Sequence, residues 1–416
     1  MILSFGFFVL FTFFIFGVNF ILIARAWITH TKDEFVNKDK PLVSILVPAY
    51  NEEVVIVESI KSLLNQDYDN YEIIIIDDGS SDKTFDIASK HFDKHDNVTI
   101  LKKVNGGKAM ALNYAAQKAK GEYFMCIDAD TVLVPHAVST MVGKRKPGVD
   151  AVAAMVGISN GCKIENGQPV SNDIPSKIST RMQWMEYCRS YVAFRCSLKD
   201  HNVITVISGA CGLISREIFE KIGGYKHDQL GEDMELTMNI HSHDGTVQFL
   251  SETLAWTEAP DNISDLSKQR VRWFRGALQA FMAHPKLIRS KGNFVFRQLL
   301  LPYIWISDVI GVWVEIAAWI TLFYMIATDA FINWPSFLLI WVFIMLGHYL
   351  NTVLIMLFVK YKLEVKYTKF HRALFMGLFE GFTYHFLYLY WLVKSHVFEI
   401  FKVSKQWNKL ERRGFN

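Results

Sequence analysis

Apolar residues form long runs near both ends of the chain and only short runs between them. A helix that crosses a bilayer needs roughly 20 apolar residues. Four stretches reach that length: Ile2 to Ala24, Leu299 to Thr328, Trp334 to Val359 and Ala373 to Val393. The first has no charged residue and lacks the basic start and small-residue cleavage site of a signal peptide. We therefore expect a membrane anchor there and membrane segments in the other three.

The region between the first two stretches has the pattern of a soluble domain. Short apolar runs predict buried strands, and they alternate with segments of helical periodicity. The expected strands are Val43–Val47, Glu72–Ile76, Val98–Leu101 and Tyr123–Ile127, and the expected helices are Glu53–Leu64, Thr84–His91 and Lys108–Lys118. Such alternation predicts a mostly parallel sheet with helices on both faces. Ligands of such sheets bind at the carboxyl ends of the strands.

The distribution of lysine and arginine predicts how the chain is oriented. Basic residues follow the first apolar stretch and fill the 360–372 connection, whereas the 328–333 connection has none. By the positive-inside rule, the soluble domain faces the cytoplasm and the N-terminus lies outside. The fourth stretch conflicts with this rule. A full crossing puts the basic tail from Lys394 to Arg413 outside, and a re-entrant or split segment keeps it inside; the sequence leaves both open.

These patterns give five expected regions. They are an N-terminal transmembrane helix (1–25), a cytosolic domain (40–263), an amphipathic interfacial helix (264–290), a C-terminal transmembrane region of about three segments (299–396) and a basic tail (397–416). We expect an integral protein of the inner or plasma membrane, in contact with membrane lipids.

Composition supports this organisation and excludes some classes of partner. Charged residues make up 20% of the chain and hydrophobic ones 51%, whereas soluble domains average about 25% charged. The net charge of +3 does not indicate nucleic acid as a partner. No pair of the five cysteines has C-x-x-C spacing, so we expect reduced thiols rather than a zinc site or a disulfide framework.

Two common nucleotide-binding motifs are absent from the sequence. No G-x-G-x-x-G follows the first expected strand, and Gly106-Gly107-Lys108 is followed by Ala109 rather than Ser or Thr. A nicotinamide-dependent enzyme and a P-loop ATPase are therefore both poor interpretations.

Paired acids follow two of the expected strands. Asp128 and Asp130 close the strand Tyr123–Ile127, where two carboxylates two residues apart can reach one ion. Oxygen ligands of this kind suit Mg²⁺ or Mn²⁺ bound to a diphosphate. Asp77 and Asp78 follow another strand and can hydrogen-bond a nucleobase or ribose. Each pair is also compatible with an ordinary acidic turn.

Two further motifs lie near the second apolar stretch. Glu232 and Asp233 precede a helical pattern over Met234–His241, where an acid either favours the helix dipole or acts as a general base. Repulsion from Glu232 favours a raised pKa for Asp233. The motif Gln269-Arg270-Val271-Arg272-Trp273 lies in an amphipathic pattern over Leu266–His284. That pattern is also typical of a helix that only lies on a membrane surface.

The order of these motifs is more specific than any one of them. Asp-Asp-Gly, then Asp-x-Asp, Glu-Asp and Gln-x-x-Arg-Trp, from about Pro41 to His284, resembles the processive members of glycosyltransferase family 2. This group includes the poly-N-acetylglucosamine, hyaluronan, chitin and cellulose synthases. The segments Val47–Glu52, Gly107–Asn113 and Ser208-Gly209-Ala210 agree with it, but Gly231 stands where Thr is frequent in the poly-N-acetylglucosamine synthases.

The resemblance implies a GT-A, Rossmann-like α/β domain inserted between transmembrane helices, and an inverting transfer from a UDP-sugar, best guessed as UDP-N-acetylglucosamine. It also implies roles for the motif residues. The nucleotide sugar is assigned to Tyr50, Glu52, Asp77, Asp78, Lys108, Asp128 and Arg272; the metal to Asp130 and Asp128; catalysis to Asp233 with Glu232; and the acceptor to Gln269, Trp273 and Ser208.

Ionisable residues within the apolar stretches predict a polar path through the membrane. Asp308 and Glu315 share a helix face, as do His348 and Asn351, and the fourth stretch contains Glu380, Tyr384 and His385. Such groups usually face a bundle interior or a wet cavity. They are compatible with passage of a hydroxyl-rich polymer and with simple hydrogen bonding between helices.

Three functions are compatible with the sequence. The first is a polymerising synthase that also helps to export its product and works with accessory membrane subunits. The second is a non-processive transferase that glycosylates a lipid or lipid carrier. The third is a membrane receptor or scaffold with an inactive nucleotide-sugar domain. The intact Asp128, Asp130 and Asp233 favour an enzyme, and Gln-x-x-Arg-Trp with the flanking apolar stretches favours the synthase.

Overall fold

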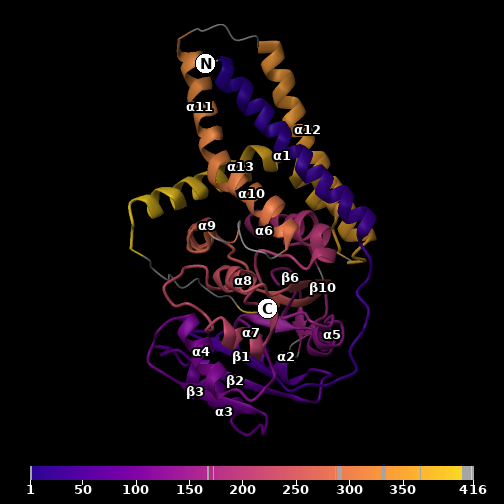
Figure 1. The fold of residues 1–416 in the computed structure, drawn as a ribbon, viewed down its shortest axis with the longest axis vertical. Helices are drawn as coiled ribbons and strands as arrows, with labels where there is room; N and C mark the ends of the chain where they lie inside the picture. The colour runs from indigo at the N-terminus through magenta and orange to yellow at the C-terminus, as the bar shows by residue number, and fades with distance from the viewer. Residues whose placement is uncertain are drawn as a thin grey trace.

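The computed structural model describes residues 2–165, 168–171, 173–285, 287, 293–328, 334–365, 367–404 and 414. Figure 1 shows an α/β domain at one end of the molecule and a group of upright helices at the other. The N-terminal helix α1 belongs to the upright group, although the sheet follows it directly in sequence. The two parts are thus built from alternating pieces of chain.

The domain is built on an eight-stranded sheet with the order β3-β2-β1-β4-β9-β6-β10-β5. The strands are β1 (Val43–Ala49), β2 (Tyr71–Asp77), β3 (Val98–Lys102), β4 (Tyr123–Cys126), β5 (Thr131–Leu133), β6 (Ala151–Ile158), β9 (Gly212–Ser215) and β10 (Val247–Thr257). The four strands predicted from the sequence are all present, with ends that differ by one or two residues. They form one half of the sheet, from β3 to β4.

The two halves of the sheet differ in strand direction. Strands β3, β2, β1 and β4 are parallel to one another, as the alternation of strands and helices predicts. Strand β9 runs antiparallel to both β4 and β6, and β5 runs antiparallel to β10, which itself is parallel to β6. The sheet is therefore mixed, and the parallel half is the part that resembles a nucleotide-binding fold.

Helices cover the sheet because each presents an apolar side to it. The helices of the domain are α2 (Ile56–Leu64), α3 (Thr84–Phe92), α4 (Lys108–Lys118), α5 (Ala137–Gly143), α7 (Arg216–Lys221) and α8 (Glu232–Ser242). Helix α8 begins two residues earlier than the sequence predicts, so that Glu232 and Asp233 lie in its first turn. In α2, for example, Ile56, Ile60 and Leu63 are fully buried at helical spacing.

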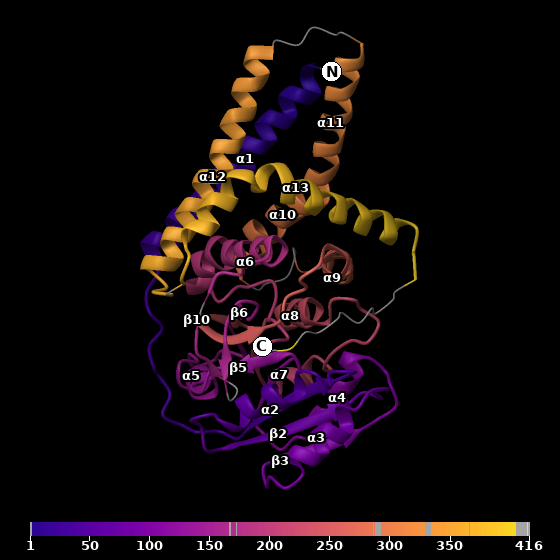
Figure 2. The ribbon, with the colours of Figure 1, turned by 180° about the vertical axis from the view of Figure 1, so that it is seen from behind.

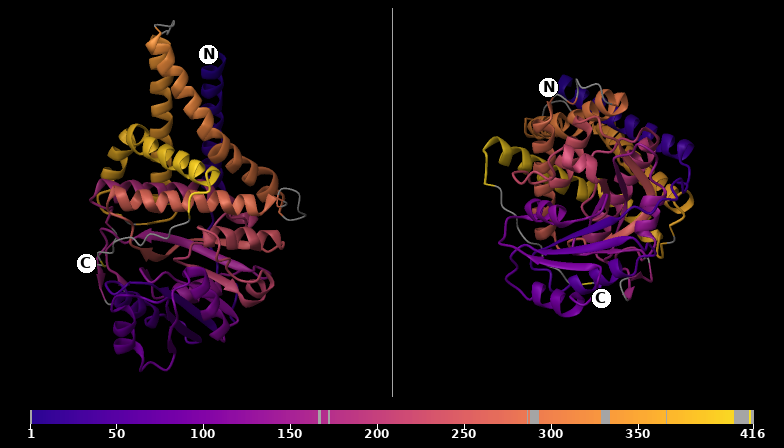
Figure 3. Two further views of the ribbon diagram at one scale, coloured as in Figure 1. Left: turned by 90° about the vertical axis from the view of Figure 1, so that its left-hand side faces the viewer. Right: turned by 60° about the horizontal axis from the view of Figure 1, so that its bottom comes forward.

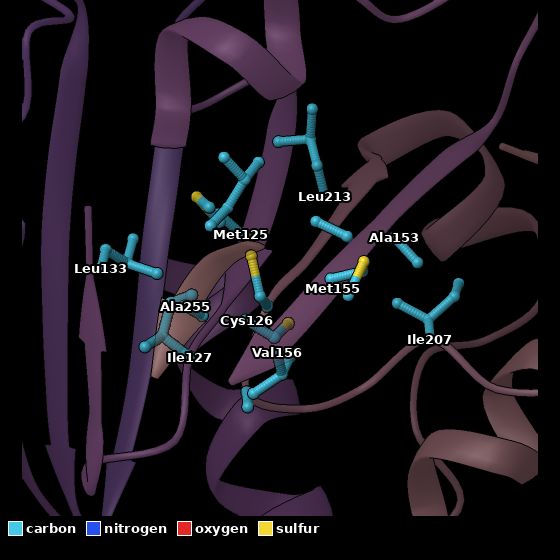
Figure 4. Close-up of a cluster of buried hydrophobic side chains, with 14 of the residues drawn as sticks. Met125, Cys126, Ile127, Leu133, Ala153, Met155, Val156, Ile207, Leu213 and Ala255 are labelled. Carbon is cyan, nitrogen blue, oxygen red and sulfur yellow. The ribbon is translucent and has the colours of Figure 1, made fainter. Parts of the chain in front are cut away.

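The core continues between the central strands. Figure 4 shows side chains from β4, β6, β9 and β10 converging there, with Leu133 of β5 beside them. The labelled residues are Met125, Cys126, Ile127, Leu133, Ala153, Met155, Val156, Ile207, Leu213 and Ala255. Cys126 and the other four cysteines are buried and free, in agreement with the absence of paired spacings in the sequence.

A layer of helices separates the sheet from the upright group. It consists of α6 (Ile178–Arg189), the π-helical segment η1 (Ser190–Cys196) and α9 (Ile263–Ala283). A small hairpin, β7 (Ile164–Glu165) and β8 (Gln168–Pro169), precedes α6 in the chain, and the 3-10 turn η2 (Lys199–His201) follows η1. Figure 3 shows α9 lying across the domain rather than along the upright helices. It matches the amphipathic helix predicted at 264–290 up to Ala283; residues 286 and 288–290 lie outside the described residues.

Among the residues that the structure describes, three helices are long and apolar enough to cross a membrane. They are α1 (Ile2–Thr29), the run that ends in α11 (Gly311–Ala327), and α12 (Trp334–Tyr361). The run before α11 consists of η4 (Val295–Leu300), α10 (Leu301–Ile304) and η5 (Trp305–Ile310), so Pro302 lies between two π-helical segments. Proline lacks the N–H that would continue the α-helical ladder, which accounts for an irregularity at this point.

The fourth apolar stretch forms α13 (His371–Ile400), which runs across the lower ends of the upright helices in Figure 2. Its C-terminal half lies on α9, where Ser395 Oγ donates to Val271 O at 3.3 Å and Arg275 Nε lies 2.5 Å from Glu399 Oε1. A segment bound to the domain in this way is not a simple upright crossing. Helix α13 extends to Ile400, past residue 397 where the basic tail is predicted to begin; residues 405–413 lie outside the described residues.

Ion pairs fix the end of α1 on the domain. Arg25 Nη2 lies 2.6 Å from Asp200 Oδ2, and Arg25 Nε donates to Ser197 O at 2.7 Å. Lys199 Nζ reaches back to Asp33 Oδ1 at 3.1 Å. Arg25, the first basic residue after the apolar stretch, thus contacts the domain, and the segment that follows α1 is bound to it through Asp33.

Candidate active site

A cavity of about 230 Å³ opens at the carboxyl ends of β1, β2 and β4. It is lined by Pro48, Ala49, Tyr50, Glu52, Asp78, Asn105, Gly107, Lys108, Asp128, Ala129, Asp130 and Arg272. Seven of these are residues that the sequence predicts to bind a nucleotide sugar or metal. One of the seven, Arg272, reaches the cavity from α9. Segments far apart in sequence thus meet at one edge of the sheet, as expected for a parallel α/β fold.

The carboxylate of Asp78 organises one wall of this cavity. Its Oδ1 accepts from Lys103 Nζ at 2.5 Å and from Gly106 N at 3.0 Å, and its Oδ2 accepts from Gly107 N at 2.7 Å. These donors fix the loop that starts α4. Asp77, predicted to lie beside it in the nucleotide pocket, is buried and is not among the lining residues; its Oδ2 accepts from Ser80 N at 3.3 Å.

Two loops that carry predicted residues are bound to each other. Asn51 Oδ1 accepts from Ser81 N at 2.7 Å, Asn51 N donates to Ser80 Oγ at 2.9 Å, and Glu52 N donates to Thr84 Oγ1 at 2.7 Å. The Tyr50–Glu52 segment after β1 is thereby fixed against the loop after β2. The cavity wall is consequently set by backbone contacts before any ligand binds.

Asp128 and Asp130 both line the cavity, as a shared metal site requires. Asp130 is buried, and its Oδ1 accepts from the hydroxyls of Thr131 and Thr257, each at 3.3 Å. Within the described residues no cluster of three or more His, Cys, Asp or Glu side chains forms a complete metal site. Two carboxylates fit the manner in which Mg²⁺ is held together with substrate phosphates and water. The residues present therefore fit a divalent ion that arrives with a diphosphate.

Lys108 connects the cavity to the start of α8. Its Nζ lies 2.7 Å from Asp128 Oδ1, 3.1 Å from Glu232 Oε1 and 3.9 Å from Asp233 Oδ2. Burial by itself lowers the pKa of Lys108, but the surrounding carboxylates outweigh burial and raise that pKa well above its ordinary value. Lys108 is therefore a permanent cation between two groups of acids. Glu232, predicted as a catalytic partner, is buried and held by this ion pair.

Asp233 has one oxygen bound and one oxygen unpaired. Gly209 N donates to its Oδ2 at 2.9 Å, whereas Oδ1 is shielded from solvent and has no hydrogen-bond partner among the described residues. Burial raises the pKa of Asp233 to about 7; Lys108 opposes the shift and Glu232 adds to it. The repulsion expected from Glu232 is therefore a secondary cause. A carboxylate that titrates near neutrality is suited to accept a proton.

The Ser208-Gly209-Ala210 segment packs directly against this carboxylate. A Cβ at Gly209 would lie 2.7 Å from Asp233 Oδ2 and 2.5 Å from Lys108 Nζ, so any larger residue would displace one of these side chains. Ser208, predicted as an acceptor residue, precedes this glycine, and its Oγ accepts from Ala210 N at 3.3 Å. The motif is consequently a support for Asp233.

Helix α9 brings the Gln-x-x-Arg-Trp residues to different neighbours. Arg272 lines the cavity, as predicted. Gln269 Oε1 accepts from Arg270 Nη1 at 2.6 Å, and the Arg270 guanidinium lies 4.3 Å from the centre of the Trp273 ring. The ring of Tyr187 lies 6.4 Å from that of Trp273. The motif therefore faces the donor cavity through Arg272 and an aromatic cluster through Trp273.

Several of the residues found here were not predicted. Lys103 and Asn105 follow β3, so a polar residue after a predicted strand was the available signal. Arg270 lies within the recognised motif, but its full burial and its partner Glu186 depend on tertiary packing. No local pattern in the 178–189 segment distinguishes Glu186 from other acids in helices.

Two more cavities lead from this region toward the upright helices. The nearer one, of about 210 Å³, is lined by Met234, Ala277 and Phe281 from α8 and α9. The farther one, of about 320 Å³, lies among α1, α11, α12 and α13 and includes Glu315, His348 and His385. Both are lined by Phe194, Tyr303, Ser307, Asp308 and Tyr388. The predicted membrane residues Asp308, Glu315, His348 and Asn351 thus share one cavity.

Comparison with known proteins relates part of this chain to a family of glycosyl transferases. Residues 44–223 match the sequence family described as "Glycosyl transferase family 2". A poly-beta-1,6-N-acetyl-D-glucosamine synthase of Staphylococcus epidermidis is 31% identical over 278 residues, which cover 66% of this chain and 63% of the synthase. A "Probable glycosyltransferase YdaM" of Bacillus subtilis is 31% identical over 249 residues, 58% of this chain and 56% of that protein. The chain therefore spans less than two thirds of these relatives.

A solved structure shares the fold over nearly the whole chain. It is described as "Mannosyltransferase PcManGT from Pyrobaculum calidifontis in complex with GDP-Man and Mn2+". The TM-score is 0.68, with 19% identity, and the match covers 96% of this chain and all of that one. At this identity the likeness establishes the fold alone. The α/β domain predicted as GT-A and its helical surroundings therefore recur together in another protein.

Proposed function

We propose, from the membership of residues 44–223 in glycosyl transferase family 2, that the whole chain is a membrane-bound synthase that polymerises sugar from a UDP-sugar. The best candidate donor is UDP-N-acetylglucosamine, because relatives that align over 66% and 58% of the chain are named poly-beta-1,6-N-acetyl-D-glucosamine synthases. The observation that carries the proposal is the arrangement of Asp128, Lys108 and Asp233. In it, Lys108 lies between Asp128 of the donor cavity and Asp233, whose carboxylate has a pKa of about 7.

The proposed reaction is a single displacement at the anomeric carbon. Asp233 accepts the proton of an acceptor hydroxyl while that oxygen forms a bond to the anomeric carbon. The bond from this carbon to the diphosphate oxygen breaks, and the nucleoside diphosphate leaves with the electron pair. Attack from the face opposite the leaving group inverts the configuration. No side chain needs to become covalently bound to the sugar.

The residues of the donor cavity have separate tasks in this scheme. Tyr50, Glu52 and Asp78 would line the nucleoside part, and Lys108 and Arg272 would attract the diphosphate. Asp130 and Asp128 would hold Mg²⁺ or Mn²⁺ beside it. That ion supplies neutralisation of the negative charge on the diphosphate.

The acceptor would approach from the opposite side, along α9. Trp273 offers an aromatic face for a sugar ring, with Gln269 and Ser208 as hydrogen-bonding groups. The nearer of the two membrane-side cavities is lined in part by Met234, the residue after Asp233, and shares five lining residues with the farther one. We propose that the product passes along these cavities and that accessory membrane subunits assist its export.

The orientation of the protein is part of the proposal. Three long apolar helices support a membrane protein. Lys32, Lys38 and Lys40 follow α1 on the side of the domain, which by the positive-inside rule places the domain in the cytoplasm. Nucleotide sugars would then reach the donor cavity directly.

The test is to incubate membranes that contain the chain with a panel of labelled UDP-sugars and to measure the size of the products. A long polymer from one donor supports the proposal. Transfer of a single sugar to a lipid would instead support a non-processive transferase. Absence of turnover with every donor, despite UDP binding, would favour an inactive nucleotide-sugar domain and overturn the proposal.

A further inference from the structure

A buried ion pair joins α9 to α6 next to the proposed acceptor site. The side chain of Arg270 is completely buried, with Nη2 2.8 Å and Nε 3.2 Å from the same oxygen, Glu186 Oε2. A guanidinium taken out of water needs such a partner, because an unpaired buried charge is strongly destabilising. Glu186 therefore determines where this arginine can lie.

A third helix contributes to the same contact. The hydroxyl of Tyr384 on α13 donates to Glu186 Oε2, so α6, α9 and α13 meet at one carboxylate oxygen. Tyr384 is only 3% exposed. A second ion pair joins α6 to α13: Arg189, one turn after Glu186, pairs with Glu380, one turn before Tyr384. The position of Glu186 is thus fixed from two sides.

The other side of Arg270 contacts two residues that the proposed function assigns to the acceptor. Its Nη1 donates to Gln269 Oε1 at 2.6 Å, and its guanidinium carbon lies 4.3 Å from the centre of the Trp273 ring. Gln269 and Trp273 are only partly buried, so their orientation depends on what they contact. Arg270 is the shared contact of both.

We propose that Glu186 and Tyr384 are positioning residues for acceptor binding. They fix the Arg270 guanidinium, which in turn fixes the ring of Trp273 and the amide of Gln269. Stability alone is a weak explanation, because a buried ion pair can often be replaced by apolar residues without loss. The ion pair, however, contacts Gln269 and Trp273 through Arg270, and an apolar pair could not orient these two residues in the same way. This inference rests on the proposed function.

The decisive variant replaces the ion pair by apolar side chains in the full chain, as Glu186→Leu combined with Arg270→Met. Tyr384→Phe is the milder variant, since it removes one hydroxyl and leaves the ion pair intact. For each we would measure the KM for an oligosaccharide primer at saturating donor, the KM for the donor and the affinity for UDP. Thermal unfolding in the same detergent reports the stability. Tyr390→Phe, at an exposed tyrosine of α13, is the matched control.

We expect the primer KM to rise about tenfold in the double variant, the size expected for a lost charge-assisted contact. The rise should be smaller but measurable in Tyr384→Phe. The donor KM, the UDP affinity and the unfolding temperature should remain close to those of the unaltered protein. Tyr390→Phe should change none of these quantities.

Trp273→Ala separates the two possible failures. If it raises the primer KM while the double variant and Tyr384→Phe do not, the positioning role is overturned and the proposed function stands. If Trp273→Ala leaves the primer KM unchanged, the acceptor role of Trp273 and this inference are both overturned. If the double variant raises the donor KM as much as the primer KM, the structure is damaged in general, and the inference is also overturned.

Discussion

The proposed donor and acceptor sides of the site are assembled in different ways. On the donor side, Asp78 binds the backbone N–H groups of Gly106 and Gly107, 28 and 29 residues away in the chain. On the acceptor side, Glu186 binds Arg270 and Tyr384, 84 and 198 residues away, through side chains alone. Backbone donors of neighbouring loops shape the first region, and side chains of three separate helices shape the second.

This difference shows where each half is vulnerable. The loops of the donor side follow directly from strands of one parallel sheet, so their relative position depends on the core of one domain. The acceptor side requires α13 to lie on α9, and therefore depends on how the helical layer docks. Changes at the donor side should affect chemistry without moving elements, whereas changes at helix contacts should affect geometry first.

The largest expected effect is at the two acids proposed to hold the metal. Asp130→Ala should abolish turnover, because it removes one of the two carboxylates, with Asp128, that line the cavity and are assigned to the divalent ion. Chelation by EDTA should have the same effect on the unaltered protein, and Mg²⁺ or Mn²⁺ should restore activity. Turnover of labelled donor is the measurement, and Asp96→Ala, at an exposed acid, is the control. Full activity of Asp130→Ala in excess chelator would contradict the assignment.

The second prediction concerns the base at the boundary of the two sides. Asp233→Asn keeps the size of the side chain but replaces the carboxylate by an amide, which does not accept a proton near neutral pH. We expect transfer to fall by roughly 10²-fold or more, as is common when a general base is removed. UDP affinity should change little, because Asp233 does not line the donor cavity. Polymerisation at the native rate in this variant would require a different base.

The pH dependence follows from the pKa of Asp233, about 7 in the folded protein. Only the ionised carboxylate can accept a proton, so activity should rise with pH up to about 7 and then level off. Below that value the ionised fraction, and with it the rate, should fall about tenfold per pH unit. The rate should be measured at saturating donor, alongside UDP affinity across the same range. A rate that stays constant between pH 5 and 7 would argue against Asp233.

The smallest expected effect is at the contact between α8 and α9. A Cβ at Gly276 would lie 2.5 Å from both N and Cα of Gly231, whereas one at Gly231 would lie 3.0 Å from Gly276 Cα. Backbone atoms cannot yield easily, so Gly276→Ala should destabilise the protein by about 1–3 kcal/mol. Gly231→Ala should be milder. Thermal unfolding measures both, and Gly17→Ala, where a Cβ meets open space, is the control.

An equal stability of Gly276→Ala and the unaltered protein would show that the two helices are not held at this distance. The contact also explains a departure of the sequence. Gly231 stands where threonine is frequent in the resembling family, and in this chain a side chain there would meet α9.

The sequence by itself determined the parallel half of the sheet, the apolar helices and most of the residues that meet in the cavity at the sheet edge. Each of these has a local origin: β-branched runs form buried strands, long apolar runs form helices, and polar residues at strand ends meet because parallel strands share an edge. Lys108–Lys118 is found as predicted to the residue. Asp128 and Asp130 line one cavity for the same reason.

Only the tertiary structure decided the course of α13, the antiparallel insertion of β9, and the partners of Arg270. The sequence left α13 between a crossing and a re-entrant segment, since its apolar content is similar in both cases. Its C-terminal half lies on α9 because Ser395 and Glu399 find partners there. Likewise Glu186 acquires its task from Arg270 and Tyr384, which are distant in the chain. Contacts between side chains of separate helices leave no periodic signal in any one of them, so they are visible only after the helices have packed.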